Sequence, residues 1–219
     1  DYVDLYYLHR INENIEIEEV AKVMGKLIDE GLIKGWGLSQ VGVEILDRAH
    51  QVTPVSAVQN LYSMMERDCE KEVIPYCLKH HIGVVPFSPI ASGFLSGKVT
   101  TETKFEGDDV RKWVPQLSKE NIERNQPLLE MIHELALKKN ATNAQISLAW
   151  MLHKYPNVVP IPGSKNKERI LENLKACQIS FTKQEFDDLE AALNKIEIYG
   201  HRGIEESQNK SFSANWRKK

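Results

Sequence analysis

Short apolar runs alternate with longer amphipathic stretches along the chain. The runs are rich in Val, Ile, Leu and Tyr and show no polar alternation, which is typical of parallel strands buried on both faces. The predicted strands span residues 3–8, 33–38, 55–59, 82–86 and 158–161.

The stretches between these runs carry apolar residues at helical spacing. The predicted helices span residues 17–30, 43–50, 70–80, 121–139, 143–153, 167–177 and 183–196. Gly31 is placed to end the first helix, and Asn143 is a candidate N-cap for the fifth. Thr182 and Glu185 have the spacing of a capping box before the last helix.

This alternation favours a parallel sheet with right-handed crossovers. An open nucleotide-binding sheet should carry a GxGxxG motif after its first strand, and the sequence has none. Five strands are too few for a closed barrel, so we expect an α/β fold of the (β/α)8 TIM barrel class, here partial, with about strands 4 to 8 and their helices. Residues 1–219 would form a single barrel domain that lacks its first three βα units, and residues 200–219 would form a polar tail.

Composition and charge disfavour several classes of function, namely nucleic-acid binding, membrane association and metal binding. The net charge of −3 gives no large basic field for nucleic acid, no polybasic segment invites a membrane surface, and no apolar run approaches the length of a membrane span. No signal-peptide pattern is visible. The histidines form no metal-binding motif, and the cysteines, Cys69, Cys77 and Cys177, lack metal-ligand spacing. We therefore expect reduced thiols, a cytoplasmic protein and no metal site.

Polar or glycine-bearing residues follow each predicted strand. In a barrel the carboxyl ends of the strands share one rim, where active sites lie. His9 follows the first strand, Ser39 the second, and Gln59 ends the third. Taken alone, a histidine at a strand end such as His9 is more often a structural residue than a catalytic one.

The last strand leads into an anion-binding pattern. Gly163 and Ser164 precede a helix whose start carries Lys165, Lys167 and Arg169. Backbone N–H groups and the helix dipole favour an anion there, so the segment predicts a phosphate site, with a solvated basic first turn as the alternative. Residues 87–93 offer hydroxyls, N–H groups and one aromatic face, which suits a pyrophosphate beside a flat ring. Together the two segments suit a dinucleotide lying across the barrel mouth.

Five segments in register resemble the aldo-keto reductase family: DLYYLHR, GLSQ, VQNLYS, PFSPIASGFLSGK and IPGSKNKERILENL. The resemblance implies a (β/α)8 barrel that binds NADPH without a Rossmann motif and works through a tetrad of Asp, Tyr, Lys and His. His9 would be the tetrad histidine. The other three members would belong to the first three βα units, which this sequence does not contain.

The resemblance also implies a cofactor site. Ser39 and Gln59 would hold the nicotinamide carboxamide, and Phe87 would stack on the nicotinamide ring. The residues implied to wrap the pyrophosphate are Ser88, Pro89, Ile90, Ser92, Gly93 and Lys98, with Arg111 closing over the cofactor. Those implied to hold the 2′-phosphate, adenosine and adenine are Gly163, Ser164, Lys165, Arg169, Glu172 and Asn173. Lys165 and Arg169 favour NADPH over NADH because a 2′-phosphate needs cations.

The implied function is that of an NADPH-dependent oxidoreductase that reduces aldehyde or ketone carbonyls of small molecules to alcohols by hydride transfer. Two alternatives stay open: an NADPH-binding sensor module of the potassium-channel β-subunit type, and a catalytically dead truncated paralogue. The 219-residue chain alone should show little or no turnover, because the tetrad Asp, Tyr and Lys are missing. The sequence indicates neither the carbonyl substrate nor the oligomeric state.

Overall fold

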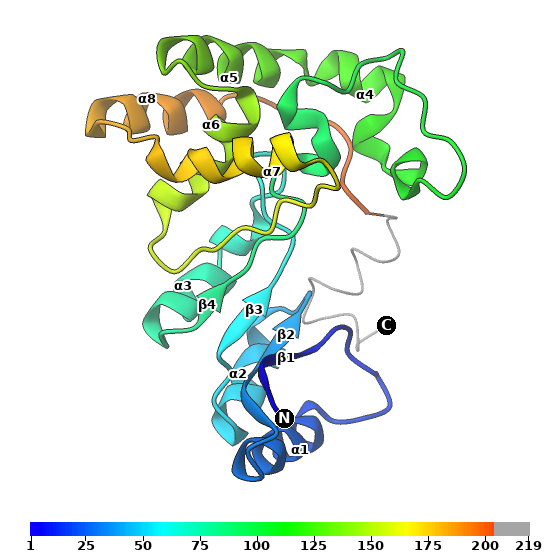
Figure 1. The fold of residues 1–219 in the computed structure, drawn as a ribbon, viewed down its shortest axis with the longest axis vertical. Coiled ribbons are helices and arrows are strands. Elements are labelled where there is room, and N and C mark those ends of the chain that lie inside the picture. The colour runs from blue at the N-terminus through cyan, green and yellow to red at the C-terminus, as the bar shows by residue number, and fades with distance from the viewer. Residues whose placement is uncertain (204–219) are drawn as a thin grey trace.

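The computed structural model describes residues 1–203 and is built around a parallel sheet (Figure 1). The sheet has the order β1-β2-β3-β4, with strands β1 (Val3–Leu8), β2 (Ile33–Ser39), β3 (Ala57–Gln59) and β4 (Gly83–Val84). Every neighbouring pair is parallel. The connections carry helices α1 (Ile17–Asp29), α2 (Val43–Val52) and α3 (Val73–Lys79), with a 3-10 turn, η1 (Asp68–Glu70), before α3. The predicted alternation of strand and helix in a parallel sheet is confirmed.

The remaining helices gather at the opposite end of the molecule from α1 and α2 (Figure 1). They are α4 (Lys119–Arg124), α5 (Gln126–Lys138), α6 (Asn143–Lys154), α7 (Lys167–Leu174) and α8 (Lys183–Leu193). Short 3-10 helices occupy the long connection after β4 and the end of α7: η2 (Ala91–Ser96), η3 (Val110–Trp113), η4 (Pro115–Leu117) and η5 (Lys175–Gln178). None of the helices formed by residues 1–203 is long and apolar enough to cross a membrane.

The predicted fifth strand is present as a short parallel partner of β4. Val158 forms a parallel bridge with Val84. The Val159 N–H donates to Val84 O at 2.8 Å, and the Ile161 N–H donates to Pro86 O at 3.0 Å. The segment therefore runs alongside β4 and leads directly towards α7.

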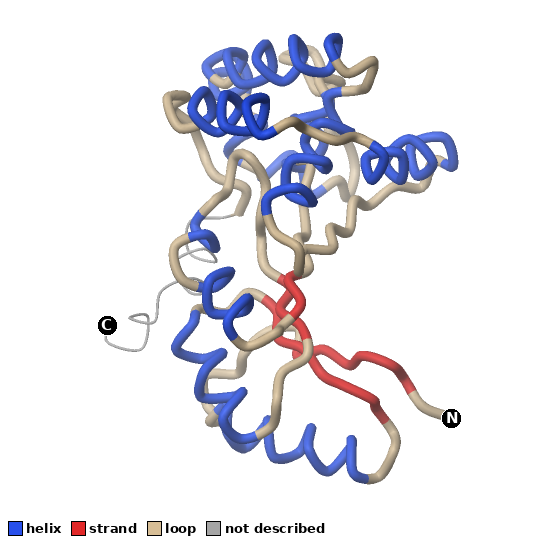
Figure 2. The backbone as a smooth tube through the Cα atoms, turned by 90° about the vertical axis from the view of Figure 1, so that its left-hand side faces the viewer, coloured by secondary structure: helices blue, strands red, loops and turns tan. Residues whose placement is uncertain are grey.

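The prediction that all strands are buried on both faces was wrong for β1. The side chains of Val3, Leu5 and Tyr6 are 49%, 39% and 49% exposed. β1 is an edge strand that pairs only with β2 within the part of the chain that the structure describes, and Figure 2 shows it at the margin of the molecule. At the other edge, Val159 and Ile161 are exposed as well.

Two helix predictions were wrong in detail. The stretch 121–139 forms two helices because Pro127, in the first turn of α5, has no N–H to continue α4. The N-cap of α6 is Thr142 instead of Asn143. Thr142 Oγ1 accepts from the Gln145 N–H at 3.3 Å, and Gln145 Oε1 accepts from the Thr142 N–H at 2.9 Å, which makes a capping box.

The ends of the other helices agree more closely with the sequence-based predictions. The helix predicted over 70–80 begins only at Val73, because η1 precedes it. The capping box of Thr182 and Glu185 at the start of α8 is confirmed. Gly31 follows α1 with a φ of +71°, a conformation that favours glycine. Of the predicted polar tail, residues 204–219 lie outside the described part of the chain.

A half-buried ion-pair cluster fastens α8 to the rest of the fold. Arg67, in the loop after β3, lies 2.8 Å from a carboxylate oxygen of Glu70 and 3.0 Å from one of Glu190 in α8. Lys154, at the end of α6, pairs with the same two carboxylates. The buried Trp150 donates its indole N–H to Glu190 at 2.5 Å. Two cations and two anions thus balance, and this balance is what makes charge burial tolerable.

Candidate functional site

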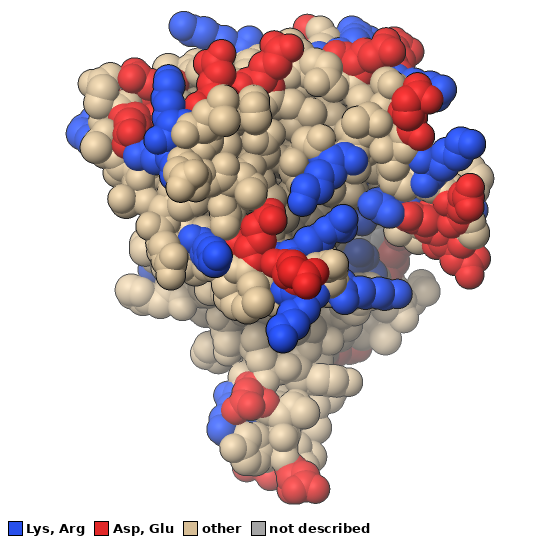
Figure 3. All heavy atoms as spheres, turned by 45° about the horizontal axis from the view of Figure 1, so that its top comes forward, with Lys and Arg blue, Asp and Glu red and all other residues tan. Residues whose placement is uncertain are grey.

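A cavity of about 990 Å³ opens between the loop that follows β4 and the segment that leads into α7. All the residues predicted to bind cofactor line it except Ser39 and Gln59; the lining ones are Phe87, Ser88, Pro89, Ile90, Ser92, Gly93, Lys98, Arg111, Gly163, Ser164, Lys165, Arg169, Glu172 and Asn173. Figure 3 shows Lys and Arg side chains gathered around a hollow on one face of the molecule. The cavity therefore combines a large volume with a cationic rim.

The start of α7 contributes the cations at one end of this cavity. Lys165 and Arg169 both line it. Asn166 is the N-cap, and its Oδ1 accepts from the Arg169 N–H at 2.9 Å. Ser164 Oγ accepts from the Asn166 N–H at 3.1 Å, which fixes the entry into the helix. The arrangement places positive side chains beside the positive end of a helix dipole, where an anion is favoured.

The loop after β4 is held in a strained conformation. Ser88, Ala91 and Ser92 have φ angles of +51°, +45° and +56°, values that residues other than glycine rarely adopt. Such left-handed positions are typical of loops that turn backbone N–H groups towards an anion. Ser92 Oγ is buried and has no hydrogen-bond partner among the described residues. The unpaired Ser92 hydroxyl could donate a hydrogen bond to a ligand that carries acceptor oxygens, such as the phosphate groups of a dinucleotide.

The far side of α7 is anchored to α6. Glu172 Oε1 accepts from the Thr142 hydroxyl at 3.0 Å, and Glu172 O accepts from Gln145 Nε2 at 2.8 Å. The capping box of α6 therefore also positions Glu172, which the family resemblance assigns to the adenine. Glu172 keeps a second carboxylate oxygen for other partners.

The carboxyl ends of β1, β2 and β3 lie level with one another. Ser39 pairs with Gln59 in the register between β2 and β3, and Leu8 pairs with Leu38 in the register between β1 and β2. His9 therefore follows β1 next to the buried Ser39. His9 itself is exposed, and His9, Ser39 and Gln59 do not line the large cavity.

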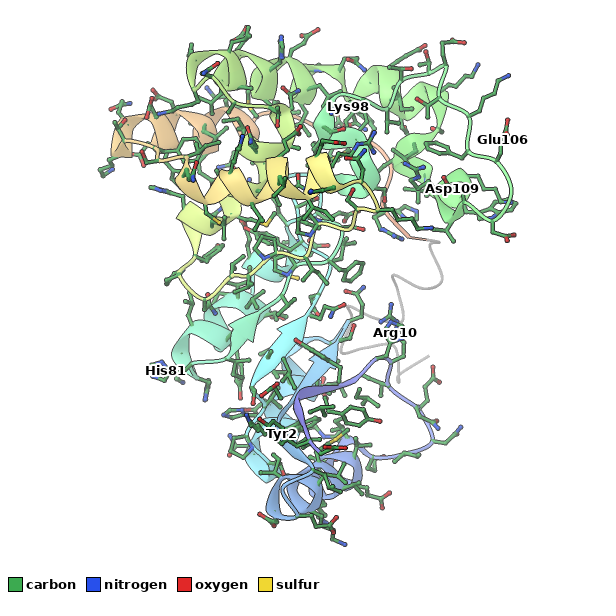
Figure 4. All side chains as sticks on the ribbon, in the orientation of Figure 1. Tyr2, Arg10, His81, Lys98, Glu106 and Asp109 are labelled. Atoms are coloured by element: carbon green, nitrogen blue, oxygen red, sulfur yellow. The ribbon has the colours of Figure 1, made fainter. Side chains whose placement is uncertain are left out.

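Arg10 connects these strand ends. Its Nη1 donates to His9 O at 2.6 Å and to Ser39 Oγ at 3.1 Å. Figure 4 shows the Arg10 side chain extending from the end of β1 towards the part of the molecule that carries Lys98 and Asp109. The arginine thus fixes the Ser39 hydroxyl and carries a positive charge to this rim.

Gln40, next to Ser39, stabilises the loop that follows β2. Its φ is +55°, and its Oε1 accepts from the Leu61 N–H at 2.8 Å. Asn60 clamps the same loop, because its side chain accepts from the Val41 N–H at 3.1 Å and donates to Val41 O at 2.8 Å. The two amide side chains lock the ends of β2 and β3 together.

Arg111 lines the cavity but is already paired. Its Nη2 lies 2.6 Å from Asp109 Oδ2, and its Nε donates to both Asp109 oxygens at 3.0 Å. This guanidinium holds the pKa of the Asp109 carboxyl well below its ordinary value, at about 2. The positive charge of Arg111 is therefore largely balanced within the loop.

The sequence prediction missed Arg202, which lines the same cavity. Arg202 belongs to a short segment, residues 199–202, that we call the strap. Arg202 Nε donates to Ser88 Oγ at 2.9 Å, and its guanidinium lies 5.9 Å from the centre of the Phe87 ring. A single arginine in a polar stretch gives no spacing pattern, so only the tertiary contacts place it here.

The strap is anchored before it reaches the cavity. Tyr199 exchanges two hydrogen bonds of 2.9 Å with the side chain of Asn125. The Gln116 N–H donates to His201 O at 3.2 Å. Gly200 adopts a φ of +75°, and a Cβ there would lie 2.9 Å from the Gln116 nitrogen. The close approach of the strap to η4 therefore requires glycine.

Glu66 holds the end of the strap. Its Oε1 accepts from the Arg202 N–H at 2.7 Å and from Gln116 Nε2 at 2.9 Å. Burial raises the pKa of the Glu66 carboxyl to about 7, although these hydrogen bonds oppose the rise. Burial lowers the pKa of Arg202; the charge of Glu66 opposes this effect, and the nearby charge of Arg10 adds to it.

Comparisons with known proteins agree with this arrangement. The sequence model of the Aldo/keto reductase family matches residues 1–194. "Probable aldo-keto reductase 1" of Glycine max is 35% identical over 202 residues, which are 92% of this chain and 58% of that protein.

Solved structures of this family are also similar. The glycerol dehydrogenase of Gluconobacter oxydans is 26% identical with a TM-score of 0.81, and the match covers 89% of this chain and 59% of that one. The aldo/keto reductase of Klebsiella pneumoniae in complex with NADP and acetate is 25% identical with a TM-score of 0.67, over 93% of this chain and 63% of that one. The chain thus spans less than two thirds of the length of these relatives. It belongs to the aldo/keto reductase family.

Proposed function

We propose that the chain binds NADPH in the cavity between the loop after β4 and the start of α7, as part of an oxidoreductase that reduces aldehyde or ketone carbonyls of small molecules to alcohols. The observation that carries this proposal is the cation-rimmed cavity of about 990 Å³, which gathers residues from two segments far apart in the sequence. The orphaned Ser92 hydroxyl supports it. The related structure from Klebsiella pneumoniae, which contains NADP, supports the choice of cofactor.

We propose further that the sheet forms strands 4 to 8 of a (β/α)8 barrel, within a single domain over residues 1–219 that lacks the first three βα units. Exposed apolar side chains at both edges support this, because Val3 and Leu5 on β1 and Val159 at the other edge would be covered by neighbouring strands. The length of the relatives leaves room for such units.

The cofactor, when bound, supplies the hydride. In this proposal Phe87 presents the ring face against which the nicotinamide lies, and Ser39 and Gln59 hold its carboxamide. Arg10 orients the Ser39 hydroxyl for that task. His9 donates a hydrogen bond to the carbonyl oxygen of the substrate, where negative charge develops during reduction.

The proton donor of the proposed reaction lies outside this chain. In the family the acid is the tetrad tyrosine, whose partners are the tetrad lysine and aspartate. We therefore expect the 219-residue chain to bind NADPH with little or no turnover, and the intact protein to carry out the reaction.

A cofactor titration tests the proposal. The wild-type chain should bind NADPH, quench its intrinsic protein fluorescence on doing so, and prefer NADPH to NADH. Replacing Lys165 with Met should weaken NADPH binding roughly tenfold and leave NADH binding unchanged, because only NADPH carries a 2′-phosphate. Lys167→Met is the matched control, because Lys167 is an exposed neighbour that does not line the cavity. Absence of NADPH binding to the wild type would contradict the proposal.

A further inference from the structure

We propose that Arg202 is a cofactor-binding residue that contacts the diphosphate group of the dinucleotide, and that the 199–202 strap is therefore a wall of the cofactor site. This inference rests on the proposed function and extends it to a residue that no family motif of the sequence indicated. The strap would then bind the cofactor in addition to packing against η4.

The hydrogen bonds of Arg202 leave most of its donors available. An arginine has five N–H donors, and the Nε–H of Arg202 is donated to Ser88 Oγ. No carboxylate within residues 1–203 lies within 4.0 Å of this guanidinium. Glu66, the nearest acid that the strap contacts, accepts the backbone N–H of Arg202. A half-buried guanidinium of this kind is stabilised by an external anion.

The position of Arg202 selects the diphosphate from the anionic groups of the cofactor. Its partner Ser88 begins the strained loop after β4, and its guanidinium lies 5.9 Å from the centre of the Phe87 ring, whereas Lys165 and Arg169 come from the segment that starts α7. The 2′-phosphate belongs to the Lys165 end in the proposed orientation. The diphosphate is the remaining anionic group, and it lies between the two ends.

The balance of charge along the loop agrees with this choice. Arg111, which the sequence assigned to this part of the cofactor, is paired with Asp109. Lys98 and Arg202 line the cavity without an ion pair to any residue from 1 to 203. A diphosphate carries two negative charges, and the two cations would balance them.

Glu66 and Ser88 fix the direction of the Arg202 side chain. The Glu66 carboxylate holds the backbone of Arg202 at 2.7 Å, and the Ser88 hydroxyl holds its Nε at 2.9 Å. The side chain is thus restrained at both ends before a ligand arrives, which reduces the entropy lost on binding. Glu66 is a positioning residue in this scheme because, within residues 1–203, its side chain accepts hydrogen bonds from the strap and from Gln116.

The test compares three ligands by calorimetric titration of the 219-residue chain. NADPH and NADH share the diphosphate, whereas adenosine 2′-monophosphate has a 2′-phosphate and no diphosphate. Arg202→Met should weaken NADPH and NADH binding by the same factor, roughly 10- to 100-fold, and leave adenosine 2′-monophosphate binding unchanged. Lys165→Met should instead weaken the binding of NADPH and adenosine 2′-monophosphate and leave NADH binding unchanged. Lys195→Met, which removes an exposed lysine away from the cavity, is the control for net charge.

Arg202→Lys guards against a general loss of structure. It keeps the charge, so it should lose less affinity for NADPH than Arg202→Met, while the two variants have the same helical circular dichroism signal. Unchanged NADPH and NADH affinities in Arg202→Met would overturn the inference and would instead favour a contact between Arg202 and the substrate. Weakened binding of adenosine 2′-monophosphate would also overturn it. If the wild type itself does not bind NADPH, the proposed function fails, and this outcome is distinct from a variant without effect.

Discussion

Lys154 Nζ lies 2.6 Å from a carboxylate oxygen of Glu190, and the two side chains are only 13% and 19% exposed. This contact joins the end of α6 to α8. Since Glu190 also pairs with Arg67 and accepts from Trp150, the lysine is one of two cations that neutralise a pair of half-buried carboxylates.

Replacing Lys154 with Met should therefore lower the free energy of unfolding by about 2–4 kcal/mol, because Glu70 and Glu190 would be left to share Arg67. Denaturant unfolding measures the change. The matched control is Lys71→Met, whose ion pair with Asp68 is exposed and should contribute less than about 0.5 kcal/mol. If the two variants lost the same free energy of unfolding, burial of the ion-pair cluster would not increase its contribution to stability.

The carboxyl of Glu66 should make stability depend on pH. Its pKa rises from an ordinary 4.5 to about 7, so its contribution to the stability of the folded state is fully present below pH 4.5 and is lost as the pH rises through 7. Glu66→Gln should remove this loss: the variant should be more stable than the wild type at about pH 8, by up to about 3 kcal/mol, and similar to it at about pH 5. Unfolding curves at the two pH values measure the difference. A constant difference between variant and wild type would contradict the assignment.

Ser92 should show effects of opposite sign on stability and binding. Because its buried hydroxyl has no partner among the described residues, Ser92→Ala should leave the free energy of unfolding unchanged or raise it by up to about 1 kcal/mol. The same variant should weaken NADPH binding, because the hydroxyl is lost to the ligand. Ser96→Ala is the contrast: Ser96 Oγ donates to Gly93 O at 2.6 Å, so its removal should destabilise the folded chain. If Ser92→Ala destabilised the chain as much as Ser96→Ala, the Ser92 hydroxyl would have a stabilising partner within the chain, and this prediction would be wrong.

A change at Gly200 should affect both the stability of the strap and ligand binding in the cavity. An alanine there would meet Asn121 Nδ2 at 2.7 Å and backbone atoms of η4, in addition to the strain of its φ of +75°. Gly200→Ala should cost about 2–3 kcal/mol and weaken NADPH binding in the same way as loss of Arg202. Gly31→Ala has nearly the same φ, +71°, and nothing within 4 Å. It should cost only about 1 kcal/mol and leave NADPH binding unchanged.

The sequence predicted those parts of the molecule that local patterns determine. Apolar runs predict the strands, and the loop 87–93 and the start of α7, which local patterns assign to one ligand, contribute residues to one cavity. Thr142 was missed as the cap of α6 because Asn143 is an equally good capping residue by type. The exposure of β1 depends on what lies beside the strand, which its own residues do not specify.

The residues that could not be predicted act through distant partners. Arg202 reaches Ser88 over 114 positions, and its backbone reaches Glu66 over 136 positions. Neither contact leaves a periodic pattern in the sequence. The role of His9, the partial barrel and the cytoplasmic location stay predictions.

The ion pair between Arg67 and Glu190 also joins residues 123 positions apart, whereas each strand–helix unit of the sheet contacts its immediate successor. Closing so long a loop costs chain entropy before the contact can form, so we expect α8 to dock after the strand–helix units have assembled. Weakening this pair should therefore speed up unfolding and leave the refolding rate nearly unchanged. On this expectation, the kinetic lifetime of the native chain would depend on the docking of a helix that lies outside the sheet.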